Sequence, residues 1–301
     1  DGLVVQDMGL LEMDLPPVPL IASTQTNNVT VEKVRFLEQV GFQRVILARE
    51  LSLPEIKKIR EQTSVELESF VHGALCVCYS GQCYLSYAQG GRSGNRGQCA
   101  QPCRLKYTLK DAAGKTIVPK KYLLSLKDLD LSEYLGEMID AGITAFKIEG
   151  RLKDVDYVKN ITGYYRKHLD QVLAHKKLQK SSSGQVQFSF EPDPNKTFNR
   201  GYSAYFIKER SKLIAANDSP KSLGEKLGLI TFVGSRHIEI ATDKKMNNGD
   251  GICFFNDQGE LQGTYVNKVE GNKAYPLKMD DLRAGIEVYL NLDKEFQKVL
   301  E

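Results

Sequence analysis

Five of the six cysteines of the 301-residue chain lie between residues 76 and 103, in a segment rich in glycine and arginine. Their spacing is Cys76-x6-Cys83-x15-Cys99-x3-Cys103, with Cys78 as an additional thiol. Disulfides suit small secreted proteins, whereas this chain is large and shows no export signal. Zinc usually takes pairs two to four residues apart, which only the last two of these cysteines provide. An iron–sulfur cluster tolerates irregular spacing, so the pattern favours a cluster while zinc and disulfides stay open.

The same segment is locally basic. The net charge of +3 is too small to predict a nucleic-acid partner, but eight basic residues and one acid, Asp111, lie between residues 92 and 121. The basic residues are Arg92, Arg96, Arg104, Lys106, Lys110, Lys115, Lys120 and Lys121. They could contact RNA phosphates, and the neighbouring tyrosines could stack on a base, namely Tyr79, Tyr84, Tyr87 and Tyr107. The alternative is an ordinary solvated surface. Cys253 lies among apolar residues elsewhere and is predicted to be a core residue.

Short apolar strands alternate with amphipathic helices in the first half of the chain. Five strands are predicted because their stretches are rich in Val, Ile, Leu or Phe: Leu3–Gln6, Pro19–Ala22, Arg44–Ala48, Val65–Val71 and Thr144–Ile148. Helices are predicted between them, one of them starting at the capping box Ser52-Leu-Pro-Glu55. This alternation predicts a parallel α/β sheet, which we interpret as part of a TIM-like barrel whose first strands precede residue 1.

The second half is different. The composition changes near the predicted linker Lys180–Gly184, after a long helix predicted around Val155–Val172. Six short strands separated by turn signals follow: Gln185–Phe190, Gly228–Val233, His237–Ala241, Gly251–Phe255, Gln262–Asn267 and Ile286–Asn291. The sequence therefore predicts an α/β domain over residues 1–179 and a small all-β barrel over residues 180–301. No apolar run is long enough to cross a bilayer, and we expect a cytoplasmic protein that does not bind membranes.

Polar residues follow the predicted strands, and in an α/β barrel such positions converge on the active site. The candidate catalytic residues are Asp7, Gln25, Glu68 and His72, with Glu50 at another strand end. Lys147 and Arg151 are candidates to bind an acidic co-substrate through charge-assisted hydrogen bonds, and Glu149 between them is a further candidate substrate-binding residue. Two alternatives remain: a structural ion-pair network at these positions, and a strand-end histidine at position 72 that is satisfied by the backbone.

One motif identifies a family. The run Glu68-Ser-Phe-x2-Gly-Ala-Leu-Cys76-x4-Gly81-x-Cys83-x2-Ser86 resembles the signature of peptidase family U32. Three further blocks resemble the same family: Val5-Gln-Asp7, Ser23-Thr-Gln25 and Phe146-Lys-Ile-Glu-Gly-Arg151. The resemblance is strong over about residues 1–175 and looser beyond, and it implies a TIM barrel at the N-terminal end. Two blocks, Gly90–Arg104 and Leu124–Asp130, resemble most the branch that hydroxylates a cytidine of 23S rRNA.

The resemblance implies RNA hydroxylation with a [4Fe-4S] cluster and with prephenate as the oxygen source. The predicted ligands are Cys76, Cys83, Cys99 and Cys103. Sister branches carry a cysteine near the position of Asp130, so the fourth ligand here is Cys103, Asp130 itself, or absent. The predicted partner is 23S rRNA or its precursor, contacted through Arg92, Arg96 and Arg104.

Peptide hydrolysis is the competing prediction, because some members of the family are described as collagenases. The chain has no His-Glu-x-x-His zinc motif and no Gly-x-Ser-x-Gly elbow. A cysteine–histidine pair built from His72 with Cys76 or Cys83 is the arrangement that would support it. Hydroxylation of an aromatic base needs a redox centre or an activated oxygen donor, which ordinary side chains cannot supply. The cysteine segment therefore favours the hydroxylase over the peptidase.

Overall fold

The computed structural model describes residues 2–301, which divide into two compact units. The first unit runs through Glu149 and also contains Tyr202–Ala215, and the second contains Gly150–Gly201 and Ala216–Glu301. The chain thus passes between the units three times, whereas the predicted domains 1–179 and 180–301 are contiguous. In the described residues no helix is long and apolar enough to cross a membrane.

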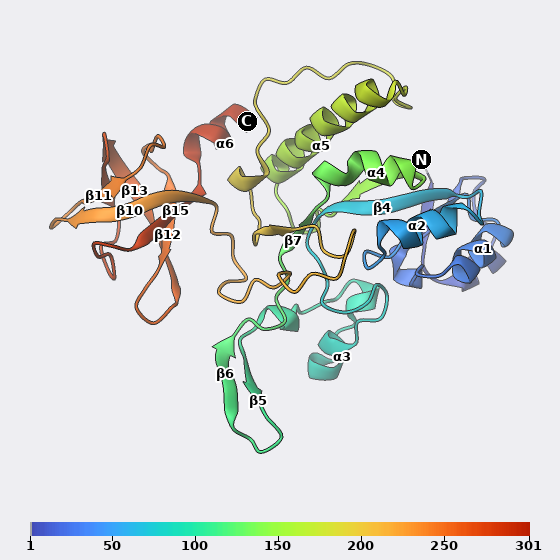
Figure 1. Ribbon diagram of the computed structural model, residues 1–301, viewed down its shortest axis with the longest axis horizontal. Helices are drawn as coiled ribbons and strands as arrows, with labels where there is room; N and C mark the ends of the chain where they lie inside the picture. Colours follow the sequence, from blue (N-terminus) through green and yellow to red (C-terminus); the bar gives the residue numbers. More distant parts are fainter. Residues whose placement is uncertain (1) are drawn as a thin grey trace. The chain divides into compact units, whose positions relative to one another are not determined.

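The first unit is built on a mixed sheet (Figure 1). Parallel pairs connect its strands in the order β1-β2-β3-β4-β8, and these are Leu3–Val5, Leu20–Ala22, Arg44–Ile46, Glu66–Gly73 and Ile143–Ile148. All five lie where the sequence predicted strands. The short strand β7 (Asp128–Asp130) pairs antiparallel with the end of β4, and β9 (Tyr202–Ser203) pairs parallel with β7. The sheet confirms a mixed α/β fold, and the TIM-like barrel stays a prediction.

The two longer helices of the first unit have side-chain caps at their N-termini, and α2 starts at the predicted capping box. In α1 (Val31–Gln39) the Thr30 side chain accepts a hydrogen bond from the backbone of Lys33, and Val34 and Leu37 are buried. In α2 (Leu53–Arg60) the Ser52 backbone N donates to Glu55 at 2.8 Å, as the capping box predicts. Two shorter helices are α3 (Leu85–Gly90) and α4 (Leu135–Asp140). The 3-10 turns of this unit are Met8–Glu12, Thr24–Thr26, Gly94–Arg96, Pro102–Arg104 and Ser132–Tyr134.

One hairpin lies outside this sheet. Strands β5 (Tyr107–Lys110) and β6 (Thr116–Lys121) pair only with each other among the described strands (Figure 1). Most of their side chains are exposed, so the alternation of buried and exposed residues that predicts a strand is absent. The hairpin carries Lys110, Lys120 and Lys121 of the basic segment.

The second unit contains a closed antiparallel barrel, which confirms the predicted all-β barrel. Its strand order is β10-β11-β14-β13-β12-β15. These strands are Glu225–Val233, Ile238–Ala241, Lys273–Pro276, Leu261–Glu270, Gly251–Phe255 and Glu287–Leu292. The core is apolar and includes Ile230, Ile240, Ile252, Val266 and Val288. Strand β14 was not predicted.

Helices α5 (Val155–Lys176) and α6 (Lys294–Leu300) and the 3-10 turn Pro194–Lys196 complete the second unit. The predicted strand Gln185–Phe190 is wrong. A side chain added at Gly163 of α5 would lie 3.2 Å from the Phe188 ring and 3.4 Å from the Phe190 ring. Phe190 also packs edge-on against Phe296 of α6. The alternating aromatic residues therefore pack on helices, and this tertiary packing overrides their strand propensity.

Candidate functional site

The loop that follows β4 carries the first three cysteines, and buried polar contacts fix it in place. The Glu50 carboxylate, only 8% exposed, accepts hydrogen bonds from the backbone N and, at 2.8 Å, from the hydroxyl of Ser80. The Asn27 side chain donates to the Ser80 carbonyl at 2.9 Å. A buried carboxylate with two donors holds a loop firmly, because breaking either bond leaves a desolvated charge.

The surroundings of Gly81 explain why the Cys-x4-Gly-x-Cys motif has a glycine at this position. Its φ is +73°, and a Cβ at this position would lie 2.1 Å from the carbonyl oxygen of Gln25. A side chain at position 81 would therefore push the cysteine loop off the 3-10 turn Thr24–Thr26. The side-chain Oε1 of Gln25 is itself buried and has no hydrogen-bond partner among the described residues.

Three thiols meet in this loop. The Sγ atoms of Cys76, Cys78 and Cys83, which we call the cysteine trio, all lie within 4.8 Å of one another. All three thiols are free and partly buried. The sequence analysis treated Cys78 as surplus, whereas the structure places it inside the trio. Asp130 is not part of this group, and its carboxylate accepts a hydrogen bond from the Ser132 backbone at 2.9 Å.

Cys99 and Cys103 lie on turns that side-chain contacts bind to the cysteine loop. The Asn95 side chain accepts a hydrogen bond from the Cys83 backbone N at 3.1 Å, and the Ser86 hydroxyl accepts one from Ala100 at 2.9 Å. The Gln101 backbone N donates to the Cys99 sulfur at 3.2 Å. Backbone N–H groups directed at sulfur are typical of ligating cysteines.

Arg104 was predicted to bind RNA, and the structure gives its guanidinium intramolecular partners. It donates to the carbonyl of Leu75 at 2.9 Å and to the hydroxyl of Ser125 at 2.8 Å, and also to the carbonyl of Leu126. Leu75 precedes Cys76 and Arg104 follows Cys103, so one side chain connects the two cysteine-bearing turns. Arg92 and Arg96 are exposed, and Arg92 Nε donates to the Gln98 carbonyl at 3.0 Å.

Burial keeps two thiols of the trio, those of Cys76 and Cys78, protonated at neutral pH by raising their pKa. Burial, together with the neighbouring thiols Cys83 and Cys78, raises the pKa of Cys76 to about 12. Burial likewise raises the pKa of Cys78 to about 11, with Cys83 adding to the effect. Binding a soft metal ion deprotonates thiols at neutral pH, because the ion's charge offsets both burial and mutual repulsion.

A small cavity adjoins the trio. Its volume is about 10 Å³, roughly the space of one water molecule. The residues that line it are Arg49, Glu50, Leu75, Cys76, Cys78, Ser80 and Tyr205. Burial raises the pKa of Tyr205 to about 12, and the carboxylate of Glu50 adds to this effect. The phenol therefore stays protonated here at neutral pH.

Arg49 is a site residue that the sequence analysis missed. Its guanidinium lies 3.7 Å from the centre of the Phe70 ring and 3.1 Å from the Glu149 carboxylate. Burial lowers the pKa of Arg49, while Glu149 and Cys76 oppose that shift. Its position directly after the predicted strand Arg44–Ala48, next to the noted Glu50, was the available signal.

Lys147, which is paired with Glu68, lies near the same ring. Glu68 is 8% exposed, accepts a hydrogen bond from Arg44 at 3.2 Å and lies 3.6 Å from the Lys147 ammonium. That ammonium is 5.5 Å from the centre of the Phe70 ring. The predicted residues thus belong to two separate sets of ion pairs, Arg44–Glu68–Lys147 and Arg49–Glu149, and each set has a cation near the Phe70 ring. Arg151 is exposed and lies in the second unit.

The two remaining catalytic candidates, His72 and Asp7, contact neighbouring residues of the first unit. His72 is 1% exposed, lies opposite Asp130 in the β4–β7 pair, and its ring centre is 5.2 Å from that of Tyr202. Asp7 is exposed and caps the following turn by accepting a hydrogen bond from Gly9 at 2.9 Å. Cys253 is buried in the barrel, as predicted.

Comparison with known proteins gives consistent matches. Residues 1–216 match the family model "Peptidase family U32". The chain is 46% identical to the "23S rRNA 5-hydroxycytidine C2501 synthase" of Escherichia coli (strain K12), over 100% of this chain and 47% of that protein. It is 39% identical to the "tRNA hydroxylation protein P1" of Bacillus subtilis (strain 168), over 58% of this chain and 43% of that protein.

A relative with a different name also matches. The chain is 32% identical to a "Collagenase" of Porphyromonas gingivalis (strain ATCC BAA-308 / W83), over 79% of this chain and 55% of that protein. The chain spans about half the length of the curated relatives it matches.

Proposed function

This chain belongs to peptidase family U32, and from that premise we propose that it is part of an RNA-modifying enzyme that hydroxylates a cytidine of 23S rRNA. The observation that carries the proposal is the gathering of free thiols on one anchored loop. Support comes from the relative named for 5-hydroxycytidine synthesis, which is similar along the whole of this chain.

We propose that the thiols hold a [4Fe-4S] cluster. Four ligands would come from the five cysteines of the segment, with Cys76, Cys83, Cys99 and Cys103 as the predicted set. Support comes from the trio, which contains Cys76 and Cys83 of the predicted set, and from the backbone N–H that points at the Cys99 sulfur, whereas Cys99 and Cys103 lie outside the trio. When bound, the cluster supplies the electron-transfer step that hydroxylation of a base requires.

Zinc is the competing occupant. Sulfurs around one tetrahedral zinc ion stand about 3.8 Å apart, because the Zn–S distance is about 2.3 Å. The trio, with all its sulfurs within 4.8 Å of one another, is compatible with that geometry as well. Any metal analysis of this protein must therefore count iron, sulfide and zinc together.

The charged residues around Phe70 have a role in this proposal. The guanidinium of Arg49 and the ammonium of Lys147 both lie near the Phe70 ring. An acidic co-substrate, for which prephenate is the proposed identity, would bind these cations through its carboxylates. Glu68 and Glu149 hold the two cations in place and offset their charge while the co-substrate is absent.

The RNA is proposed to approach across the basic segment. Arg92 and Arg96 are exposed, and the β5–β6 hairpin adds exposed lysines. Tyr79, Tyr84 and Tyr87 are each about 60% exposed and offer rings for a base that has left its stack. We also propose a cytoplasmic location, where ribosomal RNA is found.

The relative named collagenase favours a second candidate, a U32 peptidase. That activity needs an accessible histidine beside a cysteine nucleophile. His72 is only 1% exposed and packs against Tyr202, so the geometry gives this candidate less support.

The proposal is tested by measuring whether one cytidine of 23S rRNA is hydroxylated in cells. Escherichia coli lacking its 5-hydroxycytidine synthase would be supplied with the protein, and the 23S rRNA analysed by mass spectrometry. We expect the modified cytidine to return with the wild-type protein and to stay absent with Cys83→Ser. An unmodified rRNA together with gelatin cleavage that disappears in His72→Ala would favour the peptidase instead.

A further inference from the structure

Three aromatic rings form a row across adjacent strands of the barrel. The Phe232 and His237 ring centres are 5.7 Å apart, and those of His237 and Tyr275 are 5.5 Å apart. Phe232 lies on β10, His237 directly precedes β11, and Tyr275 lies on β14, which are neighbours in the barrel. We call these three residues the aromatic row.

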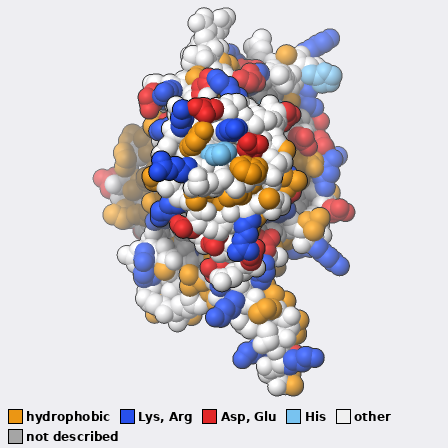
Figure 2. Space-filling view, turned by 90° about the vertical axis from the view of Figure 1, so that its left-hand side faces the viewer, with side chains coloured by type: hydrophobic (Ala, Val, Ile, Leu, Met, Phe, Trp, Pro, Cys, Tyr) orange, Lys and Arg blue, Asp and Glu red, His pale blue; other side chains and the backbone are white. Residues whose placement is uncertain are grey.

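The row lies on the outer surface of the barrel. Ile238 and Ile240 of β11 and Ala274 of β14 belong to the buried core, so the residues that alternate with them take the outer side. Phe232 is 50% exposed. Figure 2 shows hydrophobic side chains exposed among Lys and Arg side chains on the side of the molecule turned to the viewer.

A glycine makes room for the central ring. A Cβ at Gly234 would lie 2.7 Å from His237 Cε1 and 2.9 Å from its Nδ1. The imidazole therefore lies against the bare backbone of the β10–β11 turn. Cross-strand aromatic pairs also stabilise sheets, and that alone would account for two rings in contact. It does not account for half of the Phe232 ring being left in water.

Cations flank the row. Arg236 is exposed beside His237 in sequence, and Lys268 lies 5.7 Å from the centre of the Tyr275 ring. Glu270 accepts hydrogen bonds from Lys268 and from the Tyr275 hydroxyl, the latter at 2.8 Å. This contact fixes the Tyr275 ring in orientation. Exposed rings with cations at their edges are the usual arrangement for stacking bases of single-stranded nucleic acid.

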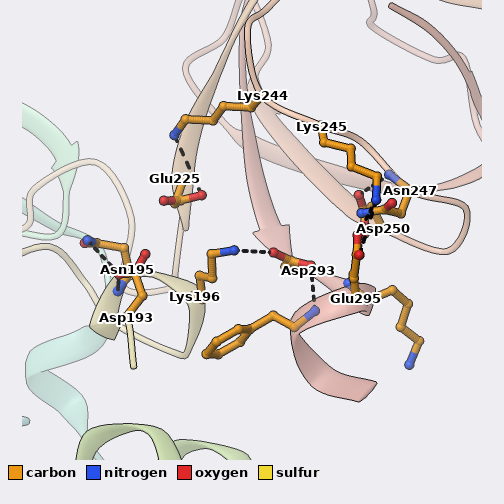
Figure 3. Close-up of polar contacts among 12 residues, drawn as sticks. Asp193, Asn195, Lys196, Glu225, Lys244, Lys245, Asn247, Asp250, Asp293 and Glu295 are labelled. Carbon is orange, nitrogen blue, oxygen red and sulfur yellow. Dashed lines mark hydrogen bonds and ion pairs between the residues drawn. The ribbon is translucent and has the colours of Figure 1, made fainter. Parts of the chain in front are cut away.

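A basic hollow lies at the other end of the same strands. Its volume is about 820 Å³, and its lining includes the residues after β11 and the turn between β13 and β14. Four lysines and two carboxylates line it, namely Lys244, Lys245, Lys294, Lys298, Asp243 and Glu295, and we call it the lysine hollow. Figure 3 shows Lys244 directed at Glu225 and Lys245 close to Glu295. The lining is thus net positive, and ion pairs orient two of its lysines, Lys244 and Lys245.

Strand β11 connects the two features. It begins at Ile238, next to the row, and ends at Ala241, next to the hollow. Four residues of strand span about 13 Å, which one extended RNA strand bridges within a few nucleotides. A ligand with flat rings and repeating negative charges matches both features, whereas an acidic peptide would not use the row in this way.

We propose that the barrel unit binds a single-stranded segment of the RNA substrate, with bases stacked on the aromatic row and phosphates in the lysine hollow. This inference rests on the proposed function and assigns it a second RNA contact, outside the cysteine-rich segment. The barrel would hold a flanking single-stranded stretch while the target cytidine reaches the cysteine site.

The test measures binding of a fluorescein-labelled 12-nucleotide oligouridine to the 301-residue protein by fluorescence anisotropy. We expect Phe232→Ala to weaken binding about 5- to 30-fold, because stacking accounts for a large part of single-strand affinity. The matched control is Phe36→Ala, which removes a ring of similar exposure, 48%, from the first unit and should leave binding unchanged. A duplex RNA of the same length should be insensitive to Phe232→Ala.

The role of the lysine hollow is tested by removing two of its charges and measuring how binding depends on salt. The double variant Lys244→Gln with Lys245→Gln should reduce the slope of log Kd against log salt by about 1.4, because each phosphate contact contributes about 0.7 for single strands. Lys208→Gln with Lys226→Gln removes two other ion-paired lysines and should leave the slope unchanged. Circular dichroism confirms that each variant is folded.

Binding that is unaffected by Phe232→Ala and by the Lys244/Lys245 variant, yet lost in Arg92→Ala with Arg96→Ala, would overturn the inference and leave the proposed function standing. Oligouridine binding that depends on Phe232, together with 23S rRNA that stays unmodified in cells, would instead contradict the proposed function. Equal loss of duplex and single-strand binding in Phe232→Ala would also overturn the stacking role.

Discussion

The cysteine-rich segment and the β-barrel are held in shape by different forces. The barrel has an apolar core in which Ile230, Ile240 and Val266 are almost completely buried. The cysteine segment has few buried apolar side chains, and its turns are fixed by polar contacts from Glu50, Arg104 and other side chains. A core tolerates any side chain of suitable size, whereas a segment fixed by particular hydrogen bonds requires particular residues. This difference explains why the cysteine segment carries a recognisable motif whereas the barrel sequence shows only a pattern of apolar residues.

The largest expected effect is on the metal. Replacing Cys83 by serine removes a soft ligand at the centre of the segment, so we expect the protein to lose nearly all of its bound metal. Metal analysis of anaerobically purified protein measures this directly. Cys253→Ser, in the buried core of the barrel, serves as the control and should retain the metal content of the wild type. Full metal retention in Cys83→Ser would show that the trio is not the site.

Removing side-chain volume from the core of the barrel should lower its stability without changing the metal content of the protein. Ile240 is 1% exposed, and Ile240→Ala should lower the free energy of unfolding by about 2–5 kcal/mol through lost burial and a cavity. Urea titration followed by circular dichroism gives this value. If the metal content falls together with stability under native conditions, the two regions do not behave independently.

Alanine substitutions at Gly81 and Gly91 distinguish the cost of backbone strain from the cost of a steric clash. Gly81 and Gly91 both have positive φ, at +73° and +69°, but a Cβ at Gly91 meets nothing within 4 Å. Gly91→Ala should cost about 1 kcal/mol for the left-handed conformation alone. Gly81→Ala should cost about 1–3 kcal/mol more, because its Cβ meets the Gln25 carbonyl. Hydrogen exchange of peptides covering residues 74–84 should increase in Gly81→Ala only, and equal exchange in both variants would contradict the close contact.

A substitution at Arg104 tests whether its hydrogen bonds, and not its alkyl chain, hold the cysteine segment in shape. Arg104→Met keeps the alkyl chain and removes the donors to Leu75, Ser125 and Leu126. We expect a loss of about 2 kcal/mol, because carbonyls in a partly buried place lose a charged donor. Arg96→Met, at an exposed position, should change stability by less than about 0.5 kcal/mol. Similar losses in the two variants would mean that Arg104 does not connect the cysteine turns.

The sequence predicted the elements whose signals are local. Five strands of the first unit and five of the barrel appear where apolar runs and turn residues placed them, because such strands are buried and their periodicity is strong. The β5–β6 hairpin was missed because its strands are mostly exposed, and Gln185–Phe190 was assigned wrongly because its aromatic residues pack on helices. Long-range packing decides both cases, and no local pattern reports it.

The candidate site was predictable in type but not in detail. Spacing and composition indicated a thiol site near residues 76–103, since several soft ligands within one segment are uncommon. The place of Cys78 depends on how the loop turns at Gly81, and the roles of Arg49 and Arg104 depend on partners far away in sequence. Arg104 resembled an RNA contact by charge alone, and only its bonds to carbonyl groups reveal the structural role.

The central claim is that the gathered thiols hold a redox-active cluster. The most direct measurement is the iron, acid-labile sulfide and zinc content of protein purified without exposure to air, with its absorption spectrum. The account predicts about four irons and four sulfides per chain and negligible zinc, with an absorption shoulder in the visible range. One zinc per chain without iron or sulfide, or protein free of all three, would contradict it.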